Sequence, residues 1–157
     1  MRAVLLLPLL LTACMSSAAT VRPAITCRLE AQPPTSIRFE LANGSGSSLW
    51  VLKWNTPLEG WKGTVLRVTR DGEELSYQGP MMKRGDPQAD AYVEIPAGGK
   101  VDATVDLAEV YDVSRPGTYK VEADGDLIDV TSGPAPRPRD QHQPMPLDCG
   151  AVTFEVR

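Results

Sequence analysis

The sequence contains a single histidine, His142, among its 157 residues. A zinc peptidase binds its metal with two histidines, usually in a His-Glu-x-x-His motif that also supplies the general base. A Ser-His-Asp hydrolase would have to use His142, yet the Gly-x-Ser-x-Gly elbow is absent. We therefore expect a protein that is not an enzyme and has no cofactor or metal, with His142 as a solvated loop residue. The alternative is an enzyme completed by histidines from a partner chain.

Positive charge is also scarce. Lysine and arginine number 16 against 20 aspartates and glutamates, which gives a formal net charge of −4. Nucleic acids are bound by clustered Lys and Arg side chains, and anionic lipid surfaces attract polybasic segments. Since neither pattern occurs, we expect no nucleic-acid partner and no membrane contact except through a lipid anchor.

Long apolar runs are missing except at the start of the chain. Arg2 is followed by an apolar stretch over residues 3–11, which is typical of an export signal and too short to span a bilayer, since a spanning helix needs about 20 residues. The motif Leu-Thr-Ala-Cys at 11–14 resembles the lipobox of bacterial lipoproteins. The resemblance implies cleavage before Cys14, acylation of Cys14 and stable tethering to a membrane. The alternative is an ordinary secretory signal cut near residues 18–19.

These features divide the chain into three parts. We expect a signal peptide at 1–13, a tether at 14–24 and one folded domain at 25–157. Cleavage would leave 144 of the 157 residues, a length sufficient for one domain with a core. Because the signal contains Arg2, the mature net charge would be about −5. The expected location is the cell envelope, with the lipid anchor at the periplasmic face of the outer membrane.

Cysteine is rare as well. If Cys14 is acylated, only Cys27 and Cys149 remain. Disulfides persist outside the cytoplasm, whereas a structural zinc site needs four Cys or His ligands. We favour a disulfide between these two residues over the alternative of two free buried thiols.

No amphipathic helix of useful length is present, and the apolar residues alternate with a period of two instead. The clearest example is residues 36–42, where Ile37, Phe39 and Leu41 share one face. Asp-Gly at 71–72 predicts a hairpin between strands at 64–70 and 73–77. Turn signals separate the remaining short strands. The sequence thus predicts an all-β fold, a single antiparallel β-sandwich of the immunoglobulin-like or Greek-key type with about seven to nine strands.

Two stretches allow more than one interpretation. Tyr119 follows the Pro-Gly turn at 116–117, as in a tyrosine corner, where a buried ring pairs its hydroxyl with the backbone; the alternative is a strand that merely contains a tyrosine. The strand at 49–54 carries Trp50 and Trp54. These tryptophans help to close the core, or one of them, or Trp61, is an exposed anchor for a protein partner.

Three polar loops complete the chain. The acidic turn with Asp124, Asp126 and Asp129 could hold Ca²⁺, but it lacks the later glycine and the closing glutamate of a calcium loop. We therefore expect a solvated acidic hairpin. Residues 133–146 form a proline-rich extended loop that contains His142. The loop at 79–90 exposes Met81 and its neighbours.

Several short segments occur in an order that resembles the N-terminal, non-catalytic region of the deuterolysin (aspzincin) metallopeptidases, particularly the bacterial peptidyl-lysine type. They are Asn-Thr-Pro-Leu-Glu-Gly at 55–60, Arg-Asp-Gly-Glu-Glu-Leu-Ser-Tyr-Gln-Gly at 70–79, Lys-Arg at 83–84 with Pro87, Tyr92 with Pro-Ala-Gly at 96–98, Asp-Leu at 106–107, Tyr-Asp at 111–112, and Gly-Thr-Tyr at 117–119. The match covers about residues 35–130. It implies a β-sandwich with a history of packing against a peptidase domain. No catalytic residue of the family has a counterpart here.

The resemblance leads to an expected function. We expect a non-catalytic envelope lipoprotein whose sandwich binds another protein, in its most specific form a prodomain-like inhibitor or chaperone of a deuterolysin-type peptidase. The alternative is a structural or assembly lipoprotein of the envelope. The expected contact surface lies on loops 55–62 and 79–90, because adaptable apolar and cationic side chains are favoured at interfaces. Its candidate residues are Trp61, Met81, Met82, Lys83 and Arg84.

Overall fold

The computed structural model describes residues 24–157. The predicted signal peptide, Cys14 and the tether up to residue 23 lie outside the described residues. The described part is all-β, as predicted, with ten strands and four short 3₁₀ helices. The strands are β1 (Ile25–Gln32), β2 (Ser36–Asn43), β3 (Leu49–Leu52), β4 (Leu66–Arg70), β5 (Glu73–Glu74), β6 (Tyr92–Ile95), β7 (Lys100–Asp106), β8 (Gly117–Ala123), β9 (Val130–Thr131) and β10 (Ala151–Val156). The 3₁₀ helices are η1 (Pro57–Glu59), η2 (Ala89–Ala91), η3 (Leu107–Glu109) and η4 (Arg139–Gln141).

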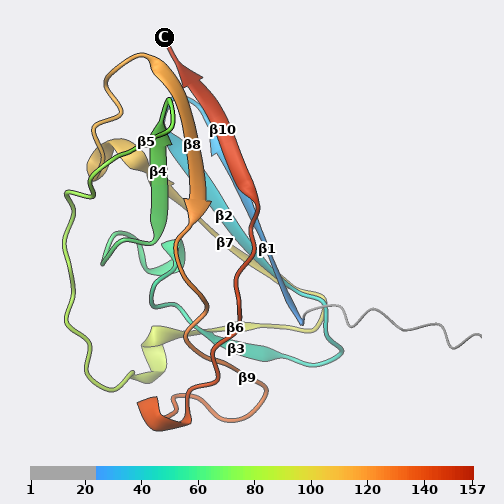
Figure 1. Ribbon diagram of the computed structural model, residues 1–157. Coiled ribbons are helices and arrows are strands. Elements are labelled where there is room, and N and C mark those ends of the chain that lie inside the picture. The colour runs from blue at the N-terminus through green and yellow to red at the C-terminus, as the bar shows by residue number, and fades with distance from the viewer. Residues whose placement is uncertain (1–23) are drawn as a thin grey trace, which may run out of the picture.

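The strands form three antiparallel sheets. Two larger sheets, β1-β2-β7 and β10-β8-β4-β5, lie one in front of the other and form the sandwich (Figure 1). The small sheet β6-β3-β9 crosses the lower end of both. Within residues 24–157, no helix is long and apolar enough to cross a bilayer.

The core lies between the two larger sheets because their strands alternate apolar and polar residues. In β2 the side chains of Ile37, Phe39 and Leu41 are fully buried, while the residues between them are half-buried. In β8 the buried positions are Tyr119 and Val121. Burying an apolar side chain of this size contributes about 1.5–3 kcal/mol, so the alternation predicted from sequence is also the main source of stability.

Tyr119 forms the predicted tyrosine corner. Its ring is fully buried and stacks against Phe154 of β10, with ring centroids 5.4 Å apart. Its hydroxyl donates a hydrogen bond of 2.7 Å to the backbone carbonyl of Arg115. The hydrogen bond satisfies the hydroxyl inside the core and fixes the loop that leads into β8.

The predicted disulfide joins Cys27 in β1 to Cys149, which stands two residues before β10. It therefore links edge strands of the two larger sheets, which lie close together on one side of the sandwich (Figure 1). The bond spans 122 residues of sequence, so it restricts most of the unfolded chain.

Three of the strands predicted above are shorter than the sequence indicates. The strand at 64–70 begins at Leu66, the strand at 73–77 is limited to Glu73–Glu74, and the strand at 49–54 ends at Leu52. After Leu52 the chain turns, and the Lys53 carbonyl accepts a hydrogen bond of 3.1 Å from the Thr56 amide. Ten strands result, slightly more than the seven to nine expected.

Replacing both Cys27 and Cys149 by alanine is expected to lower the free energy of unfolding by about 4 kcal/mol, because a closed loop of this length strongly restricts the unfolded ensemble. Urea unfolding followed by tryptophan fluorescence measures the loss. Reduced wild-type protein serves as the control and should unfold at the same midpoint as the double variant. Equal midpoints for the oxidised and reduced wild type would contradict the prediction.

Candidate functional site

The two loops expected to contact a partner lie side by side. The Met82 amide in loop 79–90 donates a hydrogen bond of 2.9 Å to the carbonyl of Lys62, the last residue of loop 55–62. Arg84 and Glu59 form an ion pair with 2.5 Å between Nη2 and Oε1. Loop 55–62 is itself held by the buried Thr56, whose hydroxyl accepts a hydrogen bond from the Leu58 amide and caps η1. The two loops therefore present one continuous surface.

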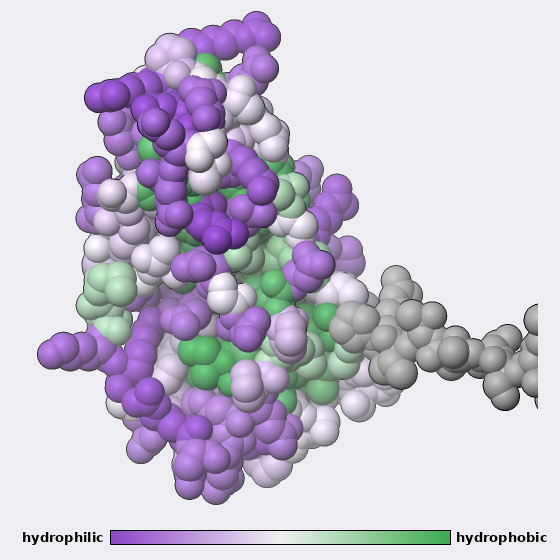
Figure 2. Space-filling model, in the orientation of Figure 1, coloured by the Kyte–Doolittle hydropathy of each residue, from purple (hydrophilic) through white to green (hydrophobic). Residues whose placement is uncertain are grey.

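Two methionines stand out on this surface. Met81 is 72% exposed and Met82 is 52% exposed, and these are the exposed large apolar side chains of the described part. Lys83 beside them is exposed as well. A pale green, moderately apolar patch lies at the left edge of Figure 2, where Figure 1 draws loop 79–90. We call Met81, Met82 and Lys83 the methionine surface. Its flexible apolar side chains can adapt to a partner.

Trp61 does not belong to this surface. Its side chain is only 8% exposed and lies in the core, with its ring near those of Tyr77 and Tyr111. The indole N–H donates a hydrogen bond of 3.2 Å to the Asp106 carbonyl. The expectation of an exposed Trp61 is wrong, because the loop folds back over the sandwich and buries its largest apolar side chain.

Arg84 is held inside the molecule's own contacts. Its guanidinium lies 5.0 Å from the centre of the Trp54 ring and pairs with Glu59, and its side chain is 23% exposed. Trp54 and Trp50 are half-buried. The Arg84 guanidinium is already paired with Glu59 and stacked on Trp54, so Arg84 contributes mainly to the shape of the surface. The exposed Lys83 supplies the positive charge of the surface.

The three aspartates of the acidic turn lie in two different environments. Asp124 and Asp126 are exposed, as expected, but Asp129 is fully buried. The Tyr92 hydroxyl donates to Asp129 Oδ2 over 2.7 Å, and Arg137 Nε donates to the same oxygen over 3.1 Å. Oδ1 accepts from Arg137 Nη2 and, over 2.8 Å, from the Gln143 amide. The solvated hairpin expected here is therefore wrong for Asp129.

These contacts alter the acidity of both Tyr92 and Asp129. Burial alone raises the pKa of the Asp129 carboxyl, but hydrogen bonds from Arg137, the Gln143 amide and Tyr92 outweigh it and lower the pKa. Burial and the hydrogen bond to Asp129 raise the pKa of Tyr92 to about 12. Asp129 is thus an ionised anchor that ties the proline-rich loop 133–146 to the small sheet.

The lone histidine lies in that loop. His142 is half-buried, and its Nε2 lies 3.2 Å from the Arg137 carbonyl oxygen. Among residues 24–157, no group of three or more His, Cys, Asp or Glu side chains is arranged to hold a metal ion. His142 therefore takes part in the packing of the loop.

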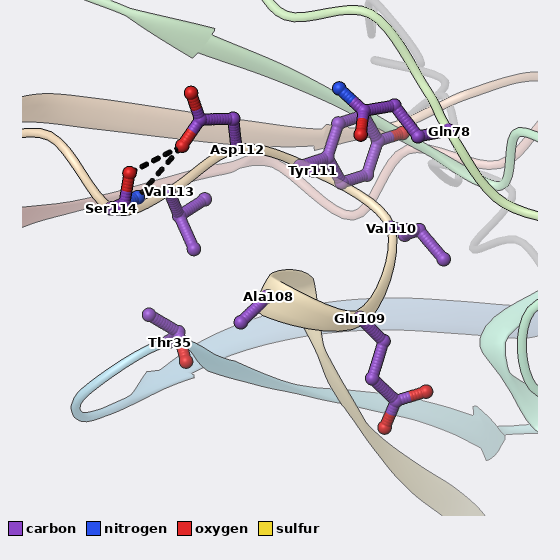
Figure 3. A pocket seen from close by; sticks show the side chains of 9 residues that line it. All are labelled: Thr35, Gln78, Ala108, Glu109, Val110, Tyr111, Asp112, Val113 and Ser114. Atoms are coloured by element: carbon purple, nitrogen blue, oxygen red, sulfur yellow. Dashed lines mark hydrogen bonds between the residues drawn. The ribbon is translucent and has the colours of Figure 1, made fainter.

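A hollow of about 510 Å³ lies beside the segment 107–114 and the turn between β1 and β2 (Figure 3). Its two carboxylates, Glu109 and Asp112, come from opposite sides of the hollow. Hydrogen bonds from the Ser114 hydroxyl and amide lower the pKa of Asp112. Asp112 is consequently a fixed anion, and the hollow shows no nucleophile paired with a base.

Comparison with known proteins gives sequence relatives. No protein-family model matches the chain. It is 30% identical over 120 residues to a neutral protease 2 homolog of Arthroderma gypseum, a match that covers 75% of this chain and 34% of the relative. A probable neutral protease 2 homolog A of Trichophyton rubrum is also 30% identical over 120 residues, covering 75% of this chain and 33% of the relative.

A bacterial relative is more distant. An extracellular protease of Aeromonas hydrophila is 27% identical over 85 residues, which covers 54% of this chain and 24% of that protein. The chain is related to the neutral protease 2 homologs. This finding supports the resemblance to the deuterolysin type. The chain spans about a third of the length of the first curated relatives it matches.

Replacing Asp129 by asparagine is expected to lower the free energy of unfolding by about 3 kcal/mol near pH 7, because it leaves Arg137 without its carboxylate. The folded pKa of Asp129 lies below the unfolded value of about 3.9. The stabilisation is therefore present above about pH 4 and disappears as the pH falls through the folded pKa. Urea unfolding at about pH 7 and about pH 3 measures the difference.

The matched control is Asp126→Asn, which removes an exposed carboxylate from the same turn. This variant should unfold with the wild-type midpoint. An equal loss of stability in the two variants would show that the buried contacts of Asp129 are not the cause.

Proposed function

We propose that the protein is a non-catalytic, protein-binding lipoprotein of the cell envelope that acts as a prodomain-like inhibitor or chaperone of a deuterolysin-type metallopeptidase. The observation that carries this proposal is a sequence relationship to named proteases over a β-sandwich that contains one histidine. A two-histidine zinc site cannot be built from these 157 residues alone. We therefore propose that these residues carry no metallopeptidase activity of their own.

The methionine surface is the proposed contact region. Met81 and Met82 expose apolar area on a loop that hydrogen bonds and an ion pair hold against its neighbour. Because these contacts hold the loop backbone in place, binding would require little further ordering of the backbone. Lys83 adds a cation that would suit the substrate cleft of a lysine-selective peptidase.

The location completes the proposal. A lipid on Cys14 would hold the sandwich at the membrane, at the periplasmic face of the outer membrane, with a short tether before β1. Metabolic labelling with a radioactive fatty acid tests this part. Cys14→Ser should abolish the label, whereas the double alanine variant of Cys27 and Cys149 should keep it.

One observation favours a second function, that of a structural or assembly lipoprotein. β10 ends its sheet and carries neither proline nor lysine, residues that commonly protect an edge strand from pairing with another chain. A partner strand could add to this edge. Affinity capture from envelope extracts separates the two functions, because only the first predicts a peptidase among the captured proteins.

Titrating the protein into a deuterolysin-type peptidase is expected to give saturable binding and a change in its activity or refolding yield. Replacing Met81 and Met82 together by glutamine should weaken binding by about tenfold or more, because central apolar contacts commonly contribute 1 kcal/mol or more each. Calorimetry and a peptide-hydrolysis assay measure the two effects.

Ala97→Gln is the control for this double variant, since it places the same polar side chain on an exposed turn. It should bind as the wild type does. Absence of binding together with unchanged peptidase activity and refolding yield would refute the proposed function.

A further inference from the structure

A groove of about 600 Å³ lies at the lower end of the molecule, next to the proline-rich loop. Its lining includes Trp54 after β3, Arg84 from loop 79–90, Ile128 before β9, and Arg139 and His142 from loop 133–146. The volume falls within the range of pockets that bind small ligands. Segments far apart in the sequence therefore build one concave surface, which we call the Trp54–Arg139 groove.

The groove is held open by contacts already in place. Asp129 fixes loop 133–146 through Arg137 and the Gln143 amide. Leu127 and Met145 pair as an isolated β-bridge with two hydrogen bonds of 2.9 Å. Because these contacts position the walls before any ligand arrives, binding would require little ordering of the protein.

Two guanidinium groups are gathered at one wall. Arg139 Nη1 donates a hydrogen bond of 3.2 Å to the backbone carbonyl of Arg84. The charge of Arg84 is balanced by Glu59. Arg139, in contrast, forms no ion pair with any carboxylate in residues 24–157, including Asp126 at the same groove. Its remaining N–H donors form a planar fork that matches a carboxylate.

The rest of the lining indicates which other ligand groups the groove could accommodate besides a carboxylate. Trp54 and Ile128 are half-buried and offer apolar surface, while Asp126 places a negative charge at the groove. Arg139, which is in no ion pair, suits a single negative charge, and Asp126 would repel the two charges of a phosphate group more strongly than the one charge of a carboxylate. The protein as a whole is negatively charged, so recognition of an anion must come from this local arrangement.

We propose that the Trp54–Arg139 groove binds a peptide segment through one carboxylate, held by Arg139, with an adjoining apolar side chain against Trp54 and Ile128. The carboxylate comes from a peptide C-terminus or from an acidic side chain. This binding site goes beyond the proposed function and does not depend on the partner being a peptidase.

The test uses the full chain and three short peptides in titrations followed by the NMR signal of the Trp54 indole N–H. The first is N-acetyl-Gly-Gly-Leu with a free C-terminal carboxylate. The second is the same peptide amidated, and the third is N-acetyl-Gly-Leu-Glu amide, whose carboxylate is on the side chain. We expect saturable shifts with the first peptide, the third, or both, and none with the second. Which of the two binds identifies the source of the carboxylate.

Arg139→Gln should weaken binding of the carboxylate peptide by about tenfold or more, since a charge-assisted hydrogen bond contributes about 1.5–3 kcal/mol. Arg139→Lys, which keeps the charge but loses the fork, should lie between this variant and the wild type. Arg157→Gln is the matched control. It removes the same charge at the C-terminus, at the opposite end of the molecule from the small sheet and loop 133–146 (Figure 1), and should bind as the wild type does.

Three results would overturn the proposal. They are the absence of a saturable shift with either carboxylate peptide, equal binding of the amidated peptide, and equal weakening by Arg139→Gln and Arg157→Gln. The last result would mean that general electrostatic attraction, and not the groove, accounts for binding.

Discussion

Burial of the facing sides of two antiparallel sheets is the constraint on which the other features of the molecule depend. The alternating residues of β2 and β8 supply the apolar contacts. Polar groups carried into this interior each need a partner, because an unpaired buried polar group costs about 1–3 kcal/mol. Among the described residues, no buried side-chain nitrogen or oxygen lacks a hydrogen-bond partner. Because each of these groups is paired, the interior can contain tyrosines, threonines and one ionised carboxylate.

The buried carboxylate shows how the fold and the candidate surfaces are connected. Asp129 immediately precedes β9 and receives four hydrogen bonds, three of them from a loop that has no regular pairing of its own over most of its length. A proline-rich segment cannot form a continuous sheet ladder, so its position depends on side-chain contacts such as these together with the isolated bridge between Leu127 and Met145. The surface at the lower end of the molecule is consequently organised by one charge in the interior.

Much of the fold could be predicted from the sequence because period-two alternation and turn residues act locally. The hairpin at Asp71-Gly72, the strand around Phe39 and the corner at Tyr119 are all present. What sequence patterns could not reveal are the contacts between segments distant in the chain. The burial of Trp61, the ion pair of Arg84 with Glu59 and the pairing of Asp129 with Arg137 all depend on how loops fold over the sheets.

For the candidate surface, the sequence indicated both loops as contact regions, but the structure gives their residues different roles. Met81, Met82 and Lys83 are exposed as expected, while Trp61 is part of the core and Arg84 is largely occupied by its own partners. Aromatic residues in a loop are common both in cores and at interfaces, and composition alone does not separate the two.

The covalent link between Cys27 and Cys149 has a consequence for the way the folded chain responds to proteolysis. Exposed loops are the preferred places for a protease to cut a folded chain. The loops at 79–90 and 133–146 both lie inside the segment closed by this bond. A single cut in either loop would leave two fragments that stay joined through sulfur, with most strand pairings intact, so the molecule can be nicked without coming apart.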